Sequence, residues 1–98
     1  MLSPRRGHYQ WRLACLQASH ALLSASPTHA AALKPVIDTA CKDAVPNVRC
    51  QATKNLAVLC AALGATATAD YKADFKGRLA TEADVDVAAS IQNFIAES

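Results

Sequence analysis

The sequence predicts an all-α fold in which antiparallel helix pairs stack into an α-solenoid. Apolar residues recur at helical spacing in five segments, and none of them has a convincing strand pattern. Two segments begin with a capping side chain shortly before a proline, at Ser26-Pro27 and at Asp43-Ala-Val-Pro46, which is a common way for a helix to start. The helical patterns also repeat after about 37 to 40 residues, a period that indicates two-helix repeats.

The first two predicted helices form one pair. The first runs from about residue 8 to residue 23 and has two apolar stripes, so we expect it to be covered on two sides. The second begins at Ser26-Pro27 and continues to about Lys42, through Pro35, which should bend it or loosen its preceding turn. The stripes of the first helix are Tyr9, Leu13, Leu16, His20 and Leu23 on one side, and Trp11, Cys15, Ala18 and Leu22 on the other.

The third predicted helix follows Asp43, which is placed to cap its free N–H groups. Pro46 is tolerated in its first turn, because a proline there lacks only a donor that would have no partner. Gly64 should end this helix in a left-handed conformation. The buried stripe is Val48, Ala52, Leu56, Leu59, Cys60 and Leu63, whereas Arg49, Gln51, Lys54 and Asn55 lie off it.

The remaining third of the chain is expected to hold a loop and two helices. Residues 64–70 are small and form the loop, and a short fourth helix spans about residues 71–79. The fifth helix begins near Asp84, with Thr81 and Glu82 as candidate caps. The expected organisation is a flexible leader at residues 1–7 and a repeat region at residues 8–98, with units at 8–42 and 43–80 and a partial unit at 81–98.

Composition favours a small globular domain, or a piece of a larger one. The 98 residues are 52% hydrophobic and 18% charged. A net charge of +2 without clustered Lys and Arg does not suit a nucleic-acid surface. A nucleic-acid partner is therefore not expected. No apolar run is long enough to cross a bilayer, so a membrane partner is not expected either. A cytoplasmic location follows, with the nucleus as the alternative compartment.

Three histidines and four cysteines raise the question of chemistry. His8, His20 and His29 form no pair at zinc-ligand spacing with each other or with the cysteines, so no metal or other cofactor is expected. The chain contains three glycines and lacks a phosphate-cradling loop, an oxyanion loop and a nucleophile elbow. We therefore expect a non-catalytic protein without a small-molecule substrate. A small thiol-dependent enzyme is a remote alternative.

Several of these residues resemble a known family. Asp43-x-x-x-Asn47-Val48-Arg49, the apolar helix after it and the later Asp84-Val-Asp-Val87 resemble HEAT repeats. More narrowly, the chain from about residue 8 to residue 95 is similar to the C-terminal repeats of the scaffold (A) subunits of protein phosphatase 2A. That similarity also includes His8-Tyr9, Arg12, Leu33-x-Pro35, Pro46 and Lys54. The resemblance implies about two and a half HEAT repeats.

The resemblance also implies a partner and a division of roles. The partner is a serine/threonine protein phosphatase catalytic subunit, joined by a variable regulatory subunit through repeats that this chain lacks. Partner contacts are expected at the turns inside each helix pair, residues 24–28 and 64–70, with Ser26, Thr28, Thr66 and Thr68 as the candidates. Lys72 is a further candidate, because with Lys76 four residues later it could present a small positive patch. Arg49 is expected to link neighbouring repeats by pairing with Asp84 or Asp86, so Asp43, Arg49, Asp84 and Asp86 are assigned structural roles.

Two further expectations concern the chain as a whole. A HEAT-repeat unit of another assembly, such as a transport receptor or another phosphatase regulator, is the alternative function. Because two and a half repeats are few for independent stability, the chain is expected to be a fragment of a longer scaffold. In isolation it should be marginally stable or self-associate through the exposed face of its first helix.

Overall fold

The computed structural model describes residues 4–97, and their side chains from Tyr9 onward. It confirms the all-α prediction, because five helices pack against one another and no strand occurs in residues 4–97. The elements are α1 (Pro4–Ala25), the short 3-10 helix η1 (Pro27–His29), α2 (Ala30–Ala40), α3 (Pro46–Leu63), α4 (Ala65–Thr81) and α5 (Val85–Ala96).

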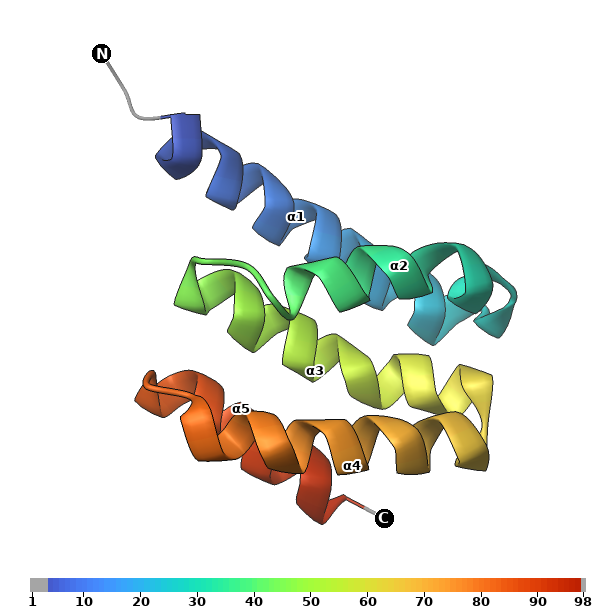
Figure 1. The fold of residues 1–98 in the computed structure, drawn as a ribbon. Coiled ribbons are helices and arrows are strands. Elements are labelled where there is room, and N and C mark those ends of the chain that lie inside the picture. Colours follow the sequence, from blue (N-terminus) through green and yellow to red (C-terminus); the bar gives the residue numbers. More distant parts are fainter. Residues whose placement is uncertain (1–3, 98) are drawn as a thin grey trace.

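The helices form two layers (Figure 1). α1, α3 and α5 pack side by side in one row, with α3 between the other two. α2 packs on α1 and α3, and α4 packs on α3 and α5, so these two helices form the second layer. The α1–α2 and α3–α4 turns lie at one end of the helices, and the α2–α3 and α4–α5 connections lie at the opposite end.

The core lies between the layers and is centred on α3. Val48, Ala52 and Leu56 of its apolar stripe have no exposed surface, because α3 has neighbours on both sides of the row and in the second layer. Phe75 of α4 meets Phe94 of α5 edge to face, with ring centroids 5.8 Å apart. The other buried apolar residues are Leu16, Leu23, Ala30, Ile37, Ala40, Cys41, Leu59, Cys60, Val87 and Ile91.

Two expectations for the first helix were wrong. α1 begins at Pro4, so residues 4–7 of the expected leader are helical, while residues 1–3 lie outside the described part of the chain. Only the stripe containing Leu16 and Leu23 is buried. The other stripe is exposed, with Trp11 at 72% and Leu22 at 46%, because within residues 4–97 no element packs on that side of α1.

The predicted loop at residues 64–70 was also wrong. α4 begins at Ala65, directly after α3, and extends to Thr81. Gly64 ends α3 as expected, but with φ 104° and ψ −178° rather than in the left-handed helical conformation. This backbone conformation is almost exclusive to glycine, and it reverses the chain in a single residue. Alanine has the highest helix propensity, so the following Ala-Thr run is helical.

Helix capping follows the predictions in part. Ser26 caps η1 as expected, and α2 continues through Pro35. Asp43 does not cap α3, because the first helical residue is Pro46 and the cap position belongs to Val45. An oxygen of Asp43 instead accepts the N–H of Val45 at 2.9 Å. Asp84 caps α5, in place of Thr81 or Glu82, by accepting the N–H groups of Asp86 and Val87.

Candidate functional site

Two arginine–carboxylate pairs connect successive helices of the row. Arg12 of α1 forms a two-point contact with Asp43, at 2.6 Å from Nε and 3.1 Å from Nη2. Arg49 of α3 forms the same kind of contact with Glu82, at 3.0 Å from Nε and 2.8 Å from Nη2. Each acid lies in the connection before the next helix of the row. The pairs therefore fix where α3 begins relative to α1, and where α5 begins relative to α3.

The carboxylates of both pairs are held in the charged form. The hydrogen bond from Arg49 lowers the pKa of Glu82 despite partial burial. Burial acts to raise the pKa of Asp43, but hydrogen bonds from Arg12 and from the Val45 N–H outweigh it and leave the pKa below its ordinary value. Each acid also accepts the backbone N–H two residues later in the chain. Each pair thus joins a side chain of one helix to the backbone that starts another.

The expected partners of Arg49 were wrong. Arg49 pairs with Glu82 and also donates to the backbone carbonyls of Asp43 and Ala44. Asp84 is occupied as the cap of α5, and Asp86 is exposed in the first turn of that helix. Glu82 precedes α5 in the sequence and was therefore assigned as a candidate cap of that helix. In the structure Asp84 is the cap, and the Glu82 side chain points back to Arg49 on α3.

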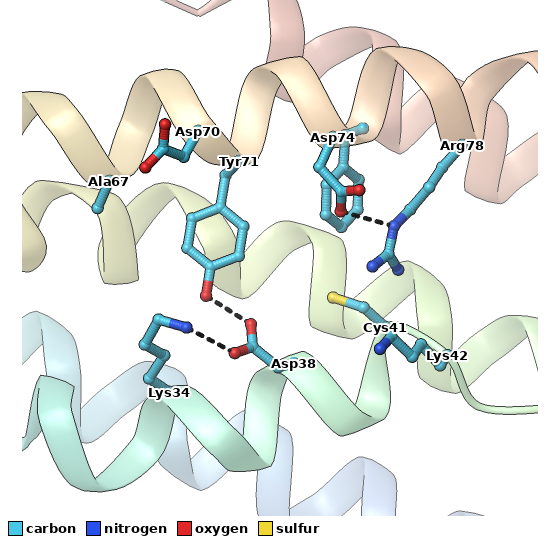
Figure 2. Close-up of a pocket in the computed structure, with 10 residues that line it drawn as sticks. Lys34, Asp38, Cys41, Lys42, Ala67, Asp70, Tyr71, Asp74 and Arg78 are labelled. Carbon is cyan, nitrogen blue, oxygen red and sulfur yellow. Dashed lines mark hydrogen bonds and ion pairs between the residues drawn. The ribbon is translucent and has the colours of Figure 1, made fainter.

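A groove of about 350 Å³ lies between α2 and α4, and charged side chains make up much of its lining (Figure 2). Tyr71 reaches across it from α4, and its hydroxyl donates to the Asp38 carboxylate on α2. Lys34 donates to the other oxygen of Asp38 at 2.8 Å, and its ammonium lies 5.4 Å from the centre of the Tyr71 ring. These three side chains form a bridge between α2 and α4.

Protonation in the groove follows from these contacts. Burial and the bond to Asp38 raise the pKa of Tyr71 to about 12. Burial favours a higher pKa for Asp38, but its bonds with Lys34 and Tyr71 prevail and lower it. Burial raises the pKa of Cys41 to about 12, so its thiol is protonated at neutral pH. A protonated, buried thiol is a poor nucleophile.

One side of the groove carries a second, local set of charges. Arg78 pairs with Asp74 one turn earlier on α4 at 2.9 Å, and its guanidinium lies 4.6 Å from the centre of the Phe75 ring. Lys42 and Asp70 complete the charged lining. Acidic and basic groups are thus interleaved, and neither sign of charge predominates in the lining of the groove.

The residues predicted to bind a partner fall into two groups. Ser26 and Thr28 lie in the α1–α2 turn, where their hydroxyls are 2.8 Å apart. Thr66 and Thr68 lie in the first turn of α4 rather than in a loop, and Thr68 donates to the Gly64 carbonyl at 2.8 Å. All four residues belong to the end of the stack where both turns lie, which we call the turn edge.

Lys72 faces a different surface. Its ammonium lies 6.0 Å from the centre of the Phe94 ring on α5, beside a hollow that Thr68 also lines.

Asn55, which the sequence placed off the buried stripe, has no exposed surface and was missed as a structural residue. Its amide donates to the Leu16 carbonyl of α1 at 2.8 Å and its oxygen accepts from Gln51. In the sequence Asn55 looks like any polar residue beside an apolar stripe, so nothing there predicted its hydrogen bond to the backbone of α1.

The described residues offer few other sites. In the part of the chain with placed side chains, which excludes His8, no three His, Cys, Asp or Glu residues gather closely enough to hold a metal ion. No helix in the described range is long and apolar enough to cross a bilayer. Comparisons of the chain with known protein families, with curated proteins and with solved structures found no match.

Proposed function

We propose that this chain is a non-catalytic scaffold piece of about two and a half HEAT repeats, and that it binds a serine/threonine protein phosphatase catalytic subunit. The observation that supports the repeat architecture is the recurrence of the arginine–carboxylate pair. Arg12 and Arg49 occupy equivalent places in α1 and α3, with their acids 31 and 33 residues further on. A repeated connection between successive helix pairs is the expected feature of a stacked solenoid.

The role of such a scaffold is positional. The rigid row of α1, α3 and α5 holds the turns between paired helices along one edge, and a bound enzyme supplies the chemistry. The turn edge carries Ser26, Thr28 and Thr66, whose short polar side chains permit close approach of a partner surface. The proposed partner rests on the resemblance to phosphatase scaffold subunits in the sequence.

The test is direct binding of the purified chain to a serine/threonine phosphatase catalytic subunit, measured by biolayer interferometry. Thr66→Arg places a bulky charge on the turn edge and should weaken binding at least about tenfold, or roughly 1.4 kcal/mol. Ala80→Arg is the matched control, because Ala80 is an exposed residue at the other end of α4. Its affinity should stay within about twofold of the original, since it is remote from the edge.

Three outcomes would contradict the proposal. Absence of binding at about 50 μM catalytic subunit would reject a specific complex. Equal weakening by both arginine substitutions would remove the turn edge from the interface. Recovery of a different partner from cells, with no phosphatase subunit, would instead favour a HEAT-repeat unit of another assembly.

A further inference from the structure

One apolar surface is left open on α1. Trp11, Cys15, Ala18 and Leu22 follow one another at intervals of four, three and four residues, so they form a single line along the helix. We call this line the α1 seam. All four side chains are exposed, whereas Leu16 and Leu23, on another side of α1, are buried.

The same line recurs on the other two helices of the row, where it is buried. The residues 37 positions later in α3 are Val48, Ala52, Asn55 and Leu59, and none has exposed surface. Asn55 bonds to the Leu16 carbonyl, so this line of α3 faces α1. A further 39 positions on, Val87, Ile91 and Phe94 of α5 are 1%, 2% and 5% exposed. The α1 seam is thus the counterpart of a helix-packing surface.

A hollow beside the α1 seam adds to this surface. It has a volume of about 490 Å³ and lies between α1 and α2, bordered by Trp11, Cys15, Pro35 and Val36. Val36 is 45% exposed. Arg12, which borders the hollow, is neutralised by Asp43. The part of the face that the hollow borders has mainly apolar walls, and among the described side chains that line it the only charges are the paired Arg12 and Asp43, so two copies of it can meet without repulsion.

We propose that the α1 seam binds a second copy of this chain, with the two α1 helices antiparallel around a two-fold axis. The spacing of the seam is the same in both directions, so an antiparallel partner matches every position. Trp11 then meets Leu22 of the partner subunit, and Cys15 meets Ala18 of the partner subunit. The small residues allow close approach at the centre, and the large ones fill the hollows where crossing helices diverge.

The alternative of end-to-end stacking fits the chain less well. It would require the outer face of α5 to cover the α1 seam of another copy. That face carries exposed Gln92 and Asn93, which would lose water without an assigned partner. It would also leave both ends open and generate filaments, whereas the two-fold arrangement closes on itself.

The available area places the expected dimer among small, weak interfaces. α1 has 22 residues, so it is about 33 Å long, and a contact strip along it with the neighbouring part of α2 covers roughly 500–600 Å² per chain. The total of about 1,000–1,200 Å² lies at the lower limit of stable interfaces. We therefore expect a reversible dimer with a dissociation constant of roughly 10 μM. This inference does not depend on the proposed phosphatase partner, which uses the turn edge.

Trp11 provides a specific readout, because it is the only tryptophan in the chain. The full chain is studied by sedimentation velocity and by tryptophan emission from about 1 to 200 μM, a range that brackets the expected dissociation constant. We expect the sedimentation coefficient to rise from monomer to dimer. The emission maximum should shift to shorter wavelength over the same concentrations, because Trp11 leaves water.

The variants separate the seam from the rest of α1. Leu22→Glu and Ala18→Glu each bury a charge in the dimer and should weaken it at least about 30-fold. Gln17→Glu adds the same charge at an exposed position on another side of α1 and should leave the dimer unchanged within about twofold. Circular dichroism checks folding, and the second seam variant keeps the test decisive if one variant unfolds.

Several results would overturn the proposal. A chain that stays monomeric at 200 μM, about 20 times the expected dissociation constant, has no such dimer. A dimer that survives both seam substitutions, or that is lost with Gln17→Glu, uses another surface. A monomer whose tryptophan emission shifts only when a different protein is added would assign the seam to that protein.

Discussion

Replacing Arg49 by methionine tests whether its pair with Glu82 holds α3 and α5 together. The side chains of Arg49 and Glu82 are only 19% and 11% exposed, so the pair lies between a surface salt bridge and a buried one. Arg49→Met leaves the carboxylate without its cation and removes donors to two backbone carbonyls. We expect the free energy of unfolding to fall by about 2 kcal/mol.

The assay is urea unfolding followed by circular dichroism at pH 7, with thermal unfolding as a second measure. For a domain of this size, about 2 kcal/mol corresponds to a drop in Tm of roughly 8–16 °C. Lys54→Ala, at an exposed position of α3, is the control and should change stability by less than about 0.5 kcal/mol. The Arg12→Met variant should lose less than Arg49→Met, because the Arg12 side chain is 38% exposed.

A double-mutant cycle isolates the pair itself. Arg49→Met and Glu82→Gln are measured separately and together, and their coupling should exceed about 1 kcal/mol. The carboxylate of Glu82 has a lowered pKa in the folded chain, so its contribution is complete above its ordinary pKa of 4.5 and is lost as the pH falls through the lower folded value. A loss for Arg49→Met no larger than that for Lys54→Ala, or a coupling near zero, would refute this reasoning.

Two further predictions concern the α3–α4 reversal and the groove. Gly64→Ala should lower the free energy of unfolding by about 1–3 kcal/mol, because there is open space around Gly64 but its backbone conformation is strained for any other residue. Gly77→Ala, inside α4, should instead raise the free energy of unfolding by about 0.5–1 kcal/mol. Equal effects in urea unfolding would contradict this. Burial raises the pKa of Cys41 from 9.0 and of Tyr71 from 10.0, each to about 12. The free energy of unfolding should therefore keep its full value below about pH 9 and fall as the pH rises toward 12, because the unfolded chain loses these protons first. A urea unfolding curve at pH 11 that matches the curve at pH 7 would contradict this prediction.

The sequence predicted the number of helices and the centre of the core because both follow from local periodicity. Val48 and Leu56 belong to one helical stripe, and the structure buries both completely. The boundaries of α4 were wrong because Gly64 was read as the start of a loop. A single residue at positive φ can replace a loop when strong helix formers follow directly. Only the backbone conformation of Gly64 distinguishes these two cases.

The contacts of the candidate site depend on residues far apart in the chain. Glu82 was read as a candidate cap from its position before α5, yet its side chain is used by Arg49, 33 residues away. The link from Tyr71 to Asp38 spans the same separation. Helical periodicity fixes which face a residue occupies, but not which of several nearby carboxylates its side chain reaches. Those choices follow from the packing of α2, α4 and α5 around α3.

The two proposed surfaces differ in how they relate to folding. On the turn edge, Ser26 is half-buried and Thr66 is exposed, and both side chains are short and polar. Changing them should therefore affect binding to a partner without disturbing the core. The α1 seam has the pattern of a core surface but remains in water, as Trp11 and Leu22 demonstrate. Burying each such side chain fully is worth about 1.5–3 kcal/mol. α1 is packed on one side of the row only, so a helix bound to its seam would give it the environment that α3 already has.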